Sequence, residues 1–317
     1  MRSLVARASR ASTGLLASAR RAVHFRAPAP PPPPPASAPA DASGSGASEP
    51  QPPPVAVDGF VVTSPHRRHT RAAPPGSPDA HDYTLPHAVY TPDETLALRT
   101  DVHYTPKTFR DRSALFAITL VRRTFDLATG YRPGHMTAHG YLTRIVFLES
   151  VAAVPGFVAA MVRHLESLRL MRRDGGFIHT LLEEAENERM HLLTFLSVHK
   201  PSLLVRALVL VAQGVMTNAL FLTYLLAPRW VHRFVGFLEE EAVHTYTNCI
   251  KDIDAGCQDL GEWRTAPAPP IAIKYWRLAP SATIRDVVLA VRADEAIHRD
   301  VNHVFASIKD GERNPFE

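Results

Sequence analysis

Three pairs of the form Glu-x-x-His occur in the sequence: Glu188/His191, Glu241/His244 and Glu295/His298. Residues three positions apart lie on the same face of a helix, so each pair would place a carboxylate beside an imidazole. These are two of the groups that bind transition metals in proteins. With 16 histidines in the chain, one such pair is expected by chance, and a single pair would indicate only a solvated helix face.

Two of these pairs share a longer pattern. "NERMH" and "DEAIH" both read Asn/Asp-Glu-x-x-His, with Asn187 four residues before His191 and Asp294 four residues before His298. We expect each polar side chain to reach the imidazole on its own helix and to fix its orientation, as groups behind metal ligands do. Because two pairs carry the same extension, we favour a metal site over two solvated helix faces.

A two-metal site in a four-helix bundle needs two more carboxylates, one from each remaining helix. One candidate is Glu149 in the apolar stretch "RIVFLESVAAVPGF", where burial without a partner would be costly. The other helix offers three consecutive glutamates, residues 239–241, in "FLEEEAVHTYT". Glu239 shares a face with Tyr246, two turns later, whereas Glu241 points about 200° away. If Glu239 is the ligand, the third Glu-x-x-His pair lies off the metal face.

The candidate ligands form a repeat, in which a lone glutamate is followed by a Glu-x-x-His pair. Carboxylate oxygens combined with two imidazoles suit iron or manganese better than zinc. The sequence therefore predicts a two-metal site with ligands in the order Glu149, Glu188, His191, Glu239, Glu295 and His298.

The elements that must position these side chains are helical. Apolar residues recur with helical spacing after about residue 110, and no strand-like alternation of useful length is present. Pro155 is expected to kink the helix that contains it. The predicted fold class is all-α: a ferritin-like four-helix bundle with a di-iron centre and two membrane-surface helices. The predicted helices are 111–128, 139–170, 176–199, 202–226, 229–256 and 282–309.

The helix 202–226 carries one charge, Arg206, and is long enough to span a bilayer. The metal site argues against a span, since Glu188 precedes this helix and Glu239 follows it. If the helix crossed the membrane, these two residues would lie on opposite sides, and no later apolar run returns the chain. We therefore expect the helix to lie along one leaflet, beside the basic helix 111–128.

The N-terminal third has a different composition. Residues 1–27 are rich in Arg, Ala and Ser and lack acids, which predicts a mitochondrial transit peptide. Residues 28–85 are rich in Pro, Ala and Ser and are predicted to be a disordered linker, before a folded domain at 86–317. Without the six arginines of residues 1–40, the formal net charge of +4 becomes −2. The basic charge thus lies in the leader, and no nucleic-acid partner is indicated.

Four motifs occur in the order "FLESVAAVPG", "LLEEAENERMHL", "FLEEEAVHTYT" and "RADEAIHRDVNH", with "FDLATGY" and "KYWRLAP" between them. From about Tyr90 to the C-terminus, the chain resembles the mitochondrial alternative oxidases. The resemblance implies that the metals are two iron ions held by the four glutamates, with His191 and His298 at or just outside the coordination shell. It also implies that Tyr246 is redox-active, and that a ubiquinol pocket is lined by Arg144, Leu148, Glu241 and Thr245.

The function implied by the resemblance is a cyanide-insensitive ubiquinol oxidase that reduces dioxygen to water without pumping protons. The expected setting is a homodimer on the matrix side of the mitochondrial inner membrane. The alternatives are a plastid-type plastoquinol terminal oxidase, a ferritin-like iron-binding protein and a di-iron monooxygenase. The apolar helix 202–226 argues against a soluble storage protein, and Tyr246 on the metal face favours full reduction of oxygen.

Overall fold

Helices make up most of the structure that is described. The computed structural model describes residues 55–62, 85, 87–309 and 311–316, all within one compact unit, Pro52–Glu317. The predicted transit peptide, 1–27, and most of the predicted linker, 28–85, lie outside the described residues.

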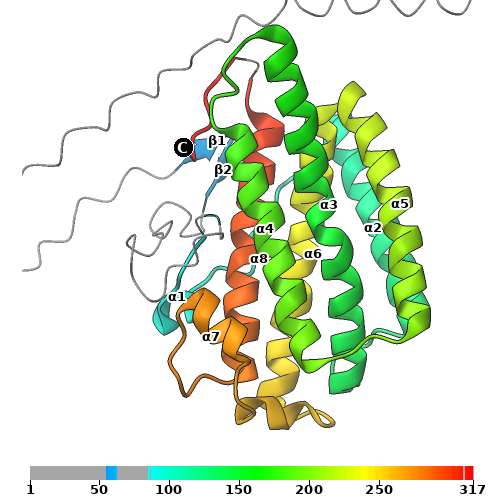
Figure 1. Cartoon of the computed structure of the whole chain (residues 1–317), viewed down its shortest axis with the longest axis vertical. Coiled ribbons are helices and arrows are strands. Elements are labelled where there is room, and N and C mark those ends of the chain that lie inside the picture. The colour runs from blue at the N-terminus through cyan, green and yellow to red at the C-terminus, as the bar shows by residue number, and fades with distance from the viewer. Residues whose placement is uncertain (1–54, 63–84, 86, 310, 317) are drawn as a thin grey trace, which may run out of the picture. The chain divides into compact units, whose positions relative to one another are not determined.

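Four long helices pack lengthwise as a bundle: α3 (Ala138–Leu170), α4 (Phe177–Val198), α6 (Pro228–Ala255) and α8 (Ile284–Ser307). α3 packs mainly against α4, and α6 packs mainly against α8. Two further long helices flank the bundle, α2 (Phe109–Thr129) against α6 and α5 (Leu203–Leu226) against α3 (Figure 1). The predicted all-helical bundle is therefore confirmed.

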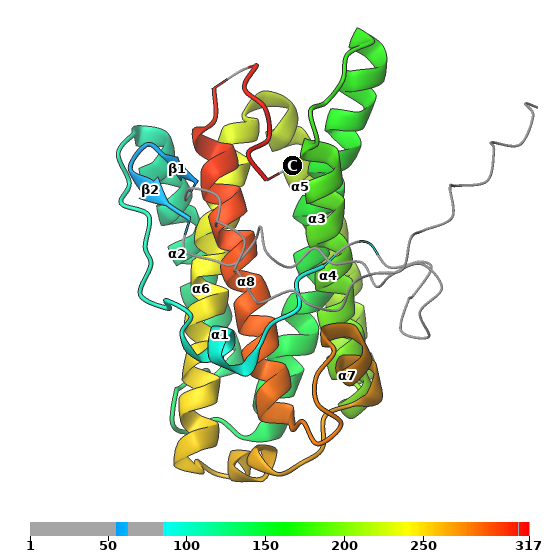
Figure 2. The same cartoon turned by 90° about the vertical axis from the view of Figure 1, so that its left-hand side faces the viewer.

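The short elements lie around this bundle. α1 (Pro92–Leu96) lies across α8, and α7 (Pro270–Trp276) packs on α4 (Figure 2). The 3-10 helix η2 (Leu260–Arg264) follows α6. Strands β1 (Ala56–Val57) and β2 (Phe60–Val61) form a small antiparallel hairpin in which Ala56 pairs with Val61.

The six predicted long helices are all present, with ends within two residues of the prediction. α2 begins earlier than predicted because Thr108, rather than Asp111, is its N-cap. The side chains of Thr108 and Asp111 each accept the other's backbone N–H, which forms a capping box. Pro155 lies inside α3, which continues through it.

The hairpin lies within the segment predicted as a linker. Phe60 is 7% exposed, and its ring packs 5.8 Å from Tyr104 and 5.1 Å from His303, measured between ring centroids. Residues 55–62 are thus part of the folded domain. The segment "VAVDGFVV" has an Asp-Gly turn between two short apolar runs, a hairpin signal that the linker prediction did not take into account.

Among the described residues, α3 and α5 are long and apolar enough to cross a membrane. They differ in burial, because 44% of the apolar window is buried in α3 and only 6% in α5. α3 is apolar because it contributes to the bundle core. α5 presents most of its apolar surface outward, and Leu220 and Tyr224 are its buried residues.

Candidate metal centre

The six residues predicted as metal ligands converge at the centre of the four-helix bundle. They form two overlapping groups, each with ligand atoms within 4.8 Å of one another. Both groups contain Glu188 from α4 and Glu295 from α8. One group is completed by Glu149 and His191, and the other by Glu239 and His298.

Several buried atoms of this cluster lack a hydrogen-bond partner among the described residues. They are His191 Nδ1, both carboxylate oxygens of Glu188 and one oxygen of Glu149. His191 Nδ1 lies 3.4 Å from Glu149 and 3.5 Å from Glu188, and His298 Nδ1 lies 2.7 Å from Glu188. Because unpaired buried polar atoms are costly, convergence of these atoms fits the binding of cations. The residues present therefore fit a di-iron centre.

The electrostatics of the cluster lead to the same conclusion. Burial and the charge of Glu188 raise the pKa of Glu149 well above its usual range, and burial with neighbouring carboxylates raises that of Glu239. Burial also opposes ionisation of Glu188, but His191 and His298 lower the pKa of this carboxyl. Positive charge from bound dications would favour the ionised form of every carboxylate in the cluster.

Asp294 connects several groups behind the centre. One of its oxygens, Oδ2, accepts hydrogen bonds from His191 Nε2 at 3.0 Å, Asn187 Nδ2 at 3.0 Å and Trp276 Nε1 at 2.8 Å. With Nε2 held by this carboxylate, Nδ1 of His191 points toward Glu149 and Glu188.

The prediction that Asn187 and Asp294 orient the imidazole on their own helix was wrong. Asp294 on α8 bonds to His191 on α4, and Asn187 bonds to Asp294 and to the Tyr275 hydroxyl. Asn187 and Asp294 each lie four residues before a histidine, and this helical spacing places both side chains near the centre. Packing between the helices then decided which histidine was reached. Tyr275 and Trp276 lie in the motif "KYWRLAP", but no spacing within one helix linked them to the predicted ligands.

Tyr246 lies at the centre, as its two-turn spacing from Glu239 predicted. The Tyr246 hydroxyl donates a hydrogen bond to Glu149 Oε1, and the side chain is 4% exposed. Burial and the charge of Glu149 raise the pKa of the phenol well above its usual range, so it keeps its proton at neutral pH.

A second buried polar group, missed in the sequence, adjoins His298. Glu184 lies one turn before Glu188 and accepts a hydrogen bond from Asn302 Nδ2 at 3.1 Å. Asn302 Oδ1 lies 3.0 Å from His232 Nδ1. Burial raises the pKa of Glu184 to about 8 and lowers that of His232 to about 4. The spacing of Glu184, one helical turn before the predicted ligand Glu188, could have predicted its burial on the same face.

Three of the four residues predicted to bind quinol belong to one polar network. Arg122 on α2 contacts Asp126 at 2.6 Å, Glu241 at 2.8 Å and Thr245 at 2.9 Å, and Asp126 lies 2.6 Å from Arg144. Arg122 and Asp126 were not predicted, since nothing in the sequence fixes which face of α2 meets α6. The fourth predicted residue, Leu148, is partly exposed on α3.

The remaining Glu-x-x-His pair lies off the metal cluster, as expected if Glu239 is the ligand. Glu241 is paired with Arg122, and His244 is exposed and contacts Asn248 at 3.1 Å.

A four-helix bundle with a buried cluster of carboxylates and two histidines defines the class of di-metal carboxylate proteins. The sequence profile of the alternative oxidase family matches residues 91–307. The chain belongs to the alternative oxidase family.

Its relatives include three fungal proteins named as mitochondrial. The alternative oxidase of Cryptococcus neoformans is 50% identical over 258 residues, which cover 74% of this chain and 63% of the relative. That of Emericella nidulans is 51% identical over 242 residues, covering 73% and 68%. Alternative oxidase 2 of Candida albicans is 47% identical over 246 residues, covering 73% and 67%. The chain thus spans slightly less than two thirds of the Cryptococcus protein.

Proposed function

We propose that this chain catalyses the reaction of its family, the oxidation of ubiquinol by dioxygen to form water, without proton pumping. The observation that carries the proposal is the pairing of two features in one structure. A buried site with two overlapping metal-binding groups lies directly beside a polar network on the outer helices. The exposed apolar surface of α5 argues against a soluble ferritin-like storage protein.

Two iron ions held by Glu149, Glu188, Glu239 and Glu295, with His191 and His298, would supply the redox chemistry on dioxygen. The chain itself holds these groups in place. Asp294 orients His191, and Glu188 and Glu295 are shared between the two metal-binding groups. The sealed core excludes water, since all six side chains are buried.

Quinol would bind near Arg144 and Leu148 on α3 and near Glu241 and Thr245 in the middle of α6, beside the C-terminal part of α2. Two of these residues directly precede residues of the metal centre in the chain: Leu148 precedes Glu149, and Thr245 precedes Tyr246. The guanidinium of Arg144 lies 4.2 Å from the Tyr131 ring centre and 4.6 Å from that of Phe125. Arg144 is only 3% exposed, so these rings enclose its guanidinium and fix its position beside the proposed site. The hydroxyl of Tyr246 donates to Glu149, and we propose that it passes a hydrogen from quinol toward the centre.

The experiment that tests the function is oxygen uptake by the purified full chain with a short-chain ubiquinol. We expect quinol-dependent uptake that millimolar cyanide leaves unchanged, because a carboxylate-rich non-haem site offers no haem iron to bind it. Hydrogen peroxide should not accumulate if water is the product. Uptake abolished by cyanide, or iron storage without quinol oxidation, would contradict the proposal.

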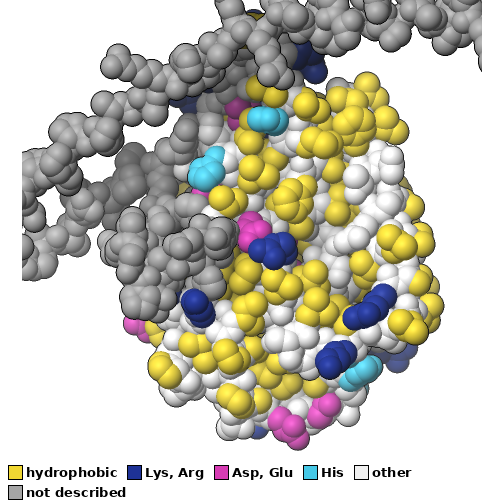
Figure 3. Space-filling model, viewed as in Figure 1, with side chains coloured by type: hydrophobic (Ala, Val, Ile, Leu, Met, Phe, Trp, Pro, Cys, Tyr) yellow, Lys and Arg dark blue, Asp and Glu magenta, His cyan; other side chains and the backbone are white. Residues whose placement is uncertain are grey.

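We also propose that the chain binds one leaflet of the inner membrane from the matrix side, through α2 and α5. Exposed apolar side chains gather along α5, where Leu204 is 70% and Leu210 is 73% exposed (Figure 3). α5 connects α4 and α6, which place Glu188 and Glu239 in one cluster. The two ends of α5 must therefore lie on the same side of the membrane.

Protease sites inserted after Lys200 and after Ala227, at the two ends of α5, test this topology. We expect both sites to be cleaved in inside-out inner-membrane vesicles and both to be protected in sealed right-side-out vesicles. Cleavage of one site from each side would show that α5 spans the bilayer. The oxidase activity of each insertion variant serves as the control for folding.

We propose that the chain forms a homodimer through a separate apolar stripe on α3. Phe157, Met161, Leu165 and Leu168 on α3 are each at least 44% exposed, and their spacing of four, four and three places them in one line. A narrow apolar line on a helix is the pattern of a helix–helix interface. α5 differs, because its exposed apolar residues cover one broad face of about 160° and do not form a narrow line.

A charge placed on this stripe should separate the subunits. We expect Leu165→Glu to shift the detergent-solubilised protein from dimer to monomer in analytical ultracentrifugation. Leu208→Glu, on the proposed membrane face of α5, is the matched control and should leave the dimer intact while weakening vesicle binding. An unchanged dimer in Leu165→Glu would place the interface elsewhere.

A further inference from the structure

The segment 87–108, here called the N-terminal strap, crosses the outer side of α6 and α8 before α2 begins. Figure 2 shows its helical turn, α1, in front of α8. The strap lies outside the four-helix bundle and contributes none of the six candidate metal ligands. The strap is held to the bundle at two separate places, and only one of them is connected to the metal centre.

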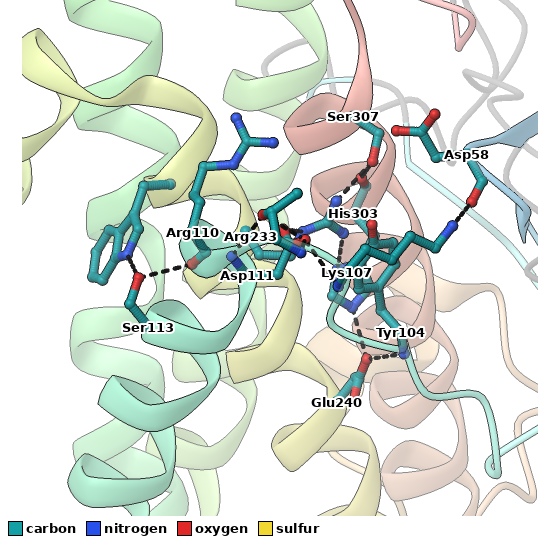
Figure 4. Close-up of polar contacts among 12 residues, drawn as sticks. Asp58, Tyr104, Lys107, Arg110, Asp111, Ser113, Arg233, Glu240, His303 and Ser307 are labelled. Atoms are coloured by element: carbon teal, nitrogen blue, oxygen red, sulfur yellow. Dashed lines mark hydrogen bonds and ion pairs between the residues drawn. The ribbon is translucent and has the colours of Figure 1, made fainter.

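One attachment is a buried charged cluster near the end of the strap (Figure 4). The backbone N–H of Tyr104 donates to Glu240 at 2.8 Å, and His303 Nε2 lies 2.7 Å from the same oxygen. The guanidinium of Arg233 lies 3.4 Å from the Tyr104 ring centre and pairs with Asp111 at 3.0 Å. These contacts fix the strap to α6 and α8, away from the atoms that converge at the metal centre.

The other attachment leads to the metal centre. The Tyr90 hydroxyl donates to Asp294 Oδ1, and Arg292 Nη2 donates to the carbonyl of Thr95 at 2.7 Å. Tyr90 is 8% exposed. Asp294 uses its second oxygen, Oδ2, for the hydrogen bond that holds His191. A single carboxylate therefore connects the strap to a candidate iron ligand.

The geometry of Asp294 explains why this connection matters. Oδ2 accepts three hydrogen bonds, and the Tyr90 hydroxyl holds the other oxygen, Oδ1, so that both ends of the carboxylate are fixed. Without that hydroxyl, a buried carboxylate oxygen would lose a donor, and rotation to find another would turn the acceptor away from His191.

We propose that Tyr90 is a positioning residue for the iron centre, and that docking of the N-terminal strap and iron binding stabilise each other. The inference rests on the proposed di-iron site. If the docked strap strengthens iron binding through Asp294 and His191, then bound iron must favour the docked strap by the same factor, because linkage is reciprocal. The strap is then a part of the metal site contributed from outside the bundle.

The test compares Tyr90→Phe with Tyr104→Phe in the full-length protein. Both changes remove one hydroxyl from the strap, but only the first touches Asp294. Iron(II) affinity is measured by competition with a chromophoric chelator. We expect Tyr90→Phe to bind iron about 10-fold more weakly than wild type or worse, as for other groups behind metal ligands. Tyr104→Phe should stay within about twofold of wild type, since its ring packing is kept.

The reciprocal effect is measured by trypsin cleavage after the exposed Arg99 in the strap. In wild type, iron loading should slow this cleavage. The fold-change should equal the fold-loss of iron affinity that occurs when the strap undocks. In Tyr90→Phe, iron should change the cleavage rate little. Thermal unfolding of the iron-free proteins controls for folding.

The outcomes separate the two proposals. Absence of iron binding in wild type would refute the proposed site and the inference with it. Normal iron binding in Tyr90→Phe would refute the inference alone. Equal weakening in Tyr90→Phe and Tyr104→Phe would also refute it, because it would show a general loosening of the strap.

Discussion

Glu188→Ala is expected to abolish both iron binding and oxygen uptake. Glu188 belongs to both groups of converging ligand atoms, and its oxygens lie 3.5 Å from His191 Nδ1 and 2.7 Å from His298 Nδ1. Alanine would remove a carboxylate common to the two ligand groups and leave both imidazoles without this neighbour. We expect turnover to fall by about 10³-fold or more, the order seen when a group acting in the reaction is removed.

The measurements are iron content by atomic absorption and ubiquinol-dependent oxygen uptake. Glu186→Ala is the matched control, since Glu186 lies on the same helix and pairs with Arg189 on the outer face at 2.5 Å. Glu240 is a poorer control, although the helix places it off the metal face, because it holds the N-terminal strap. A full complement of iron in Glu188→Ala would disprove the ligand assignment.

Tyr246→Phe is expected to keep its iron and lose nearly all turnover. The substitution removes only the hydroxyl that donates to Glu149 Oε1, and the ring remains packed in the core. If this hydroxyl transfers hydrogen during the reaction, its loss should cost about 10²–10⁴-fold in rate. The protein should fold normally, because a phenylalanine ring fills the same space.

Tyr141→Phe provides the comparison. Tyr141 is also fully buried and also donates to a carboxylate, Asp252 at 2.9 Å, but Asp252 belongs to neither ligand group. Oxygen uptake and iron content of the two variants are measured together. If Tyr246→Phe keeps a rate close to that of Tyr141→Phe, Tyr246 serves only in packing.

The sequence alone determined the features that depend on spacing within one helix. The pairs Glu188/His191 and Glu295/His298 lie on shared faces because three residues make nearly one helical turn. The same periodicity selected Glu239 from three consecutive glutamates, through its two-turn spacing from Tyr246. Caps, prolines and apolar periodicity located the six long helices. Each of these signals is local, so it can be interpreted without knowing what the helix packs against.

The tertiary structure decided which groups meet across helices. Asp294 holds His191 on another helix, contrary to the local prediction, because the register between α4 and α8 sets which imidazole lies opposite. Arg122 joins Glu241 only where α2 crosses α6, and Tyr90 reaches Asp294 across 204 positions of the chain. Helical periodicity fixes which face a side chain occupies. The partner of that face depends on packing angle and register, which no single helix encodes.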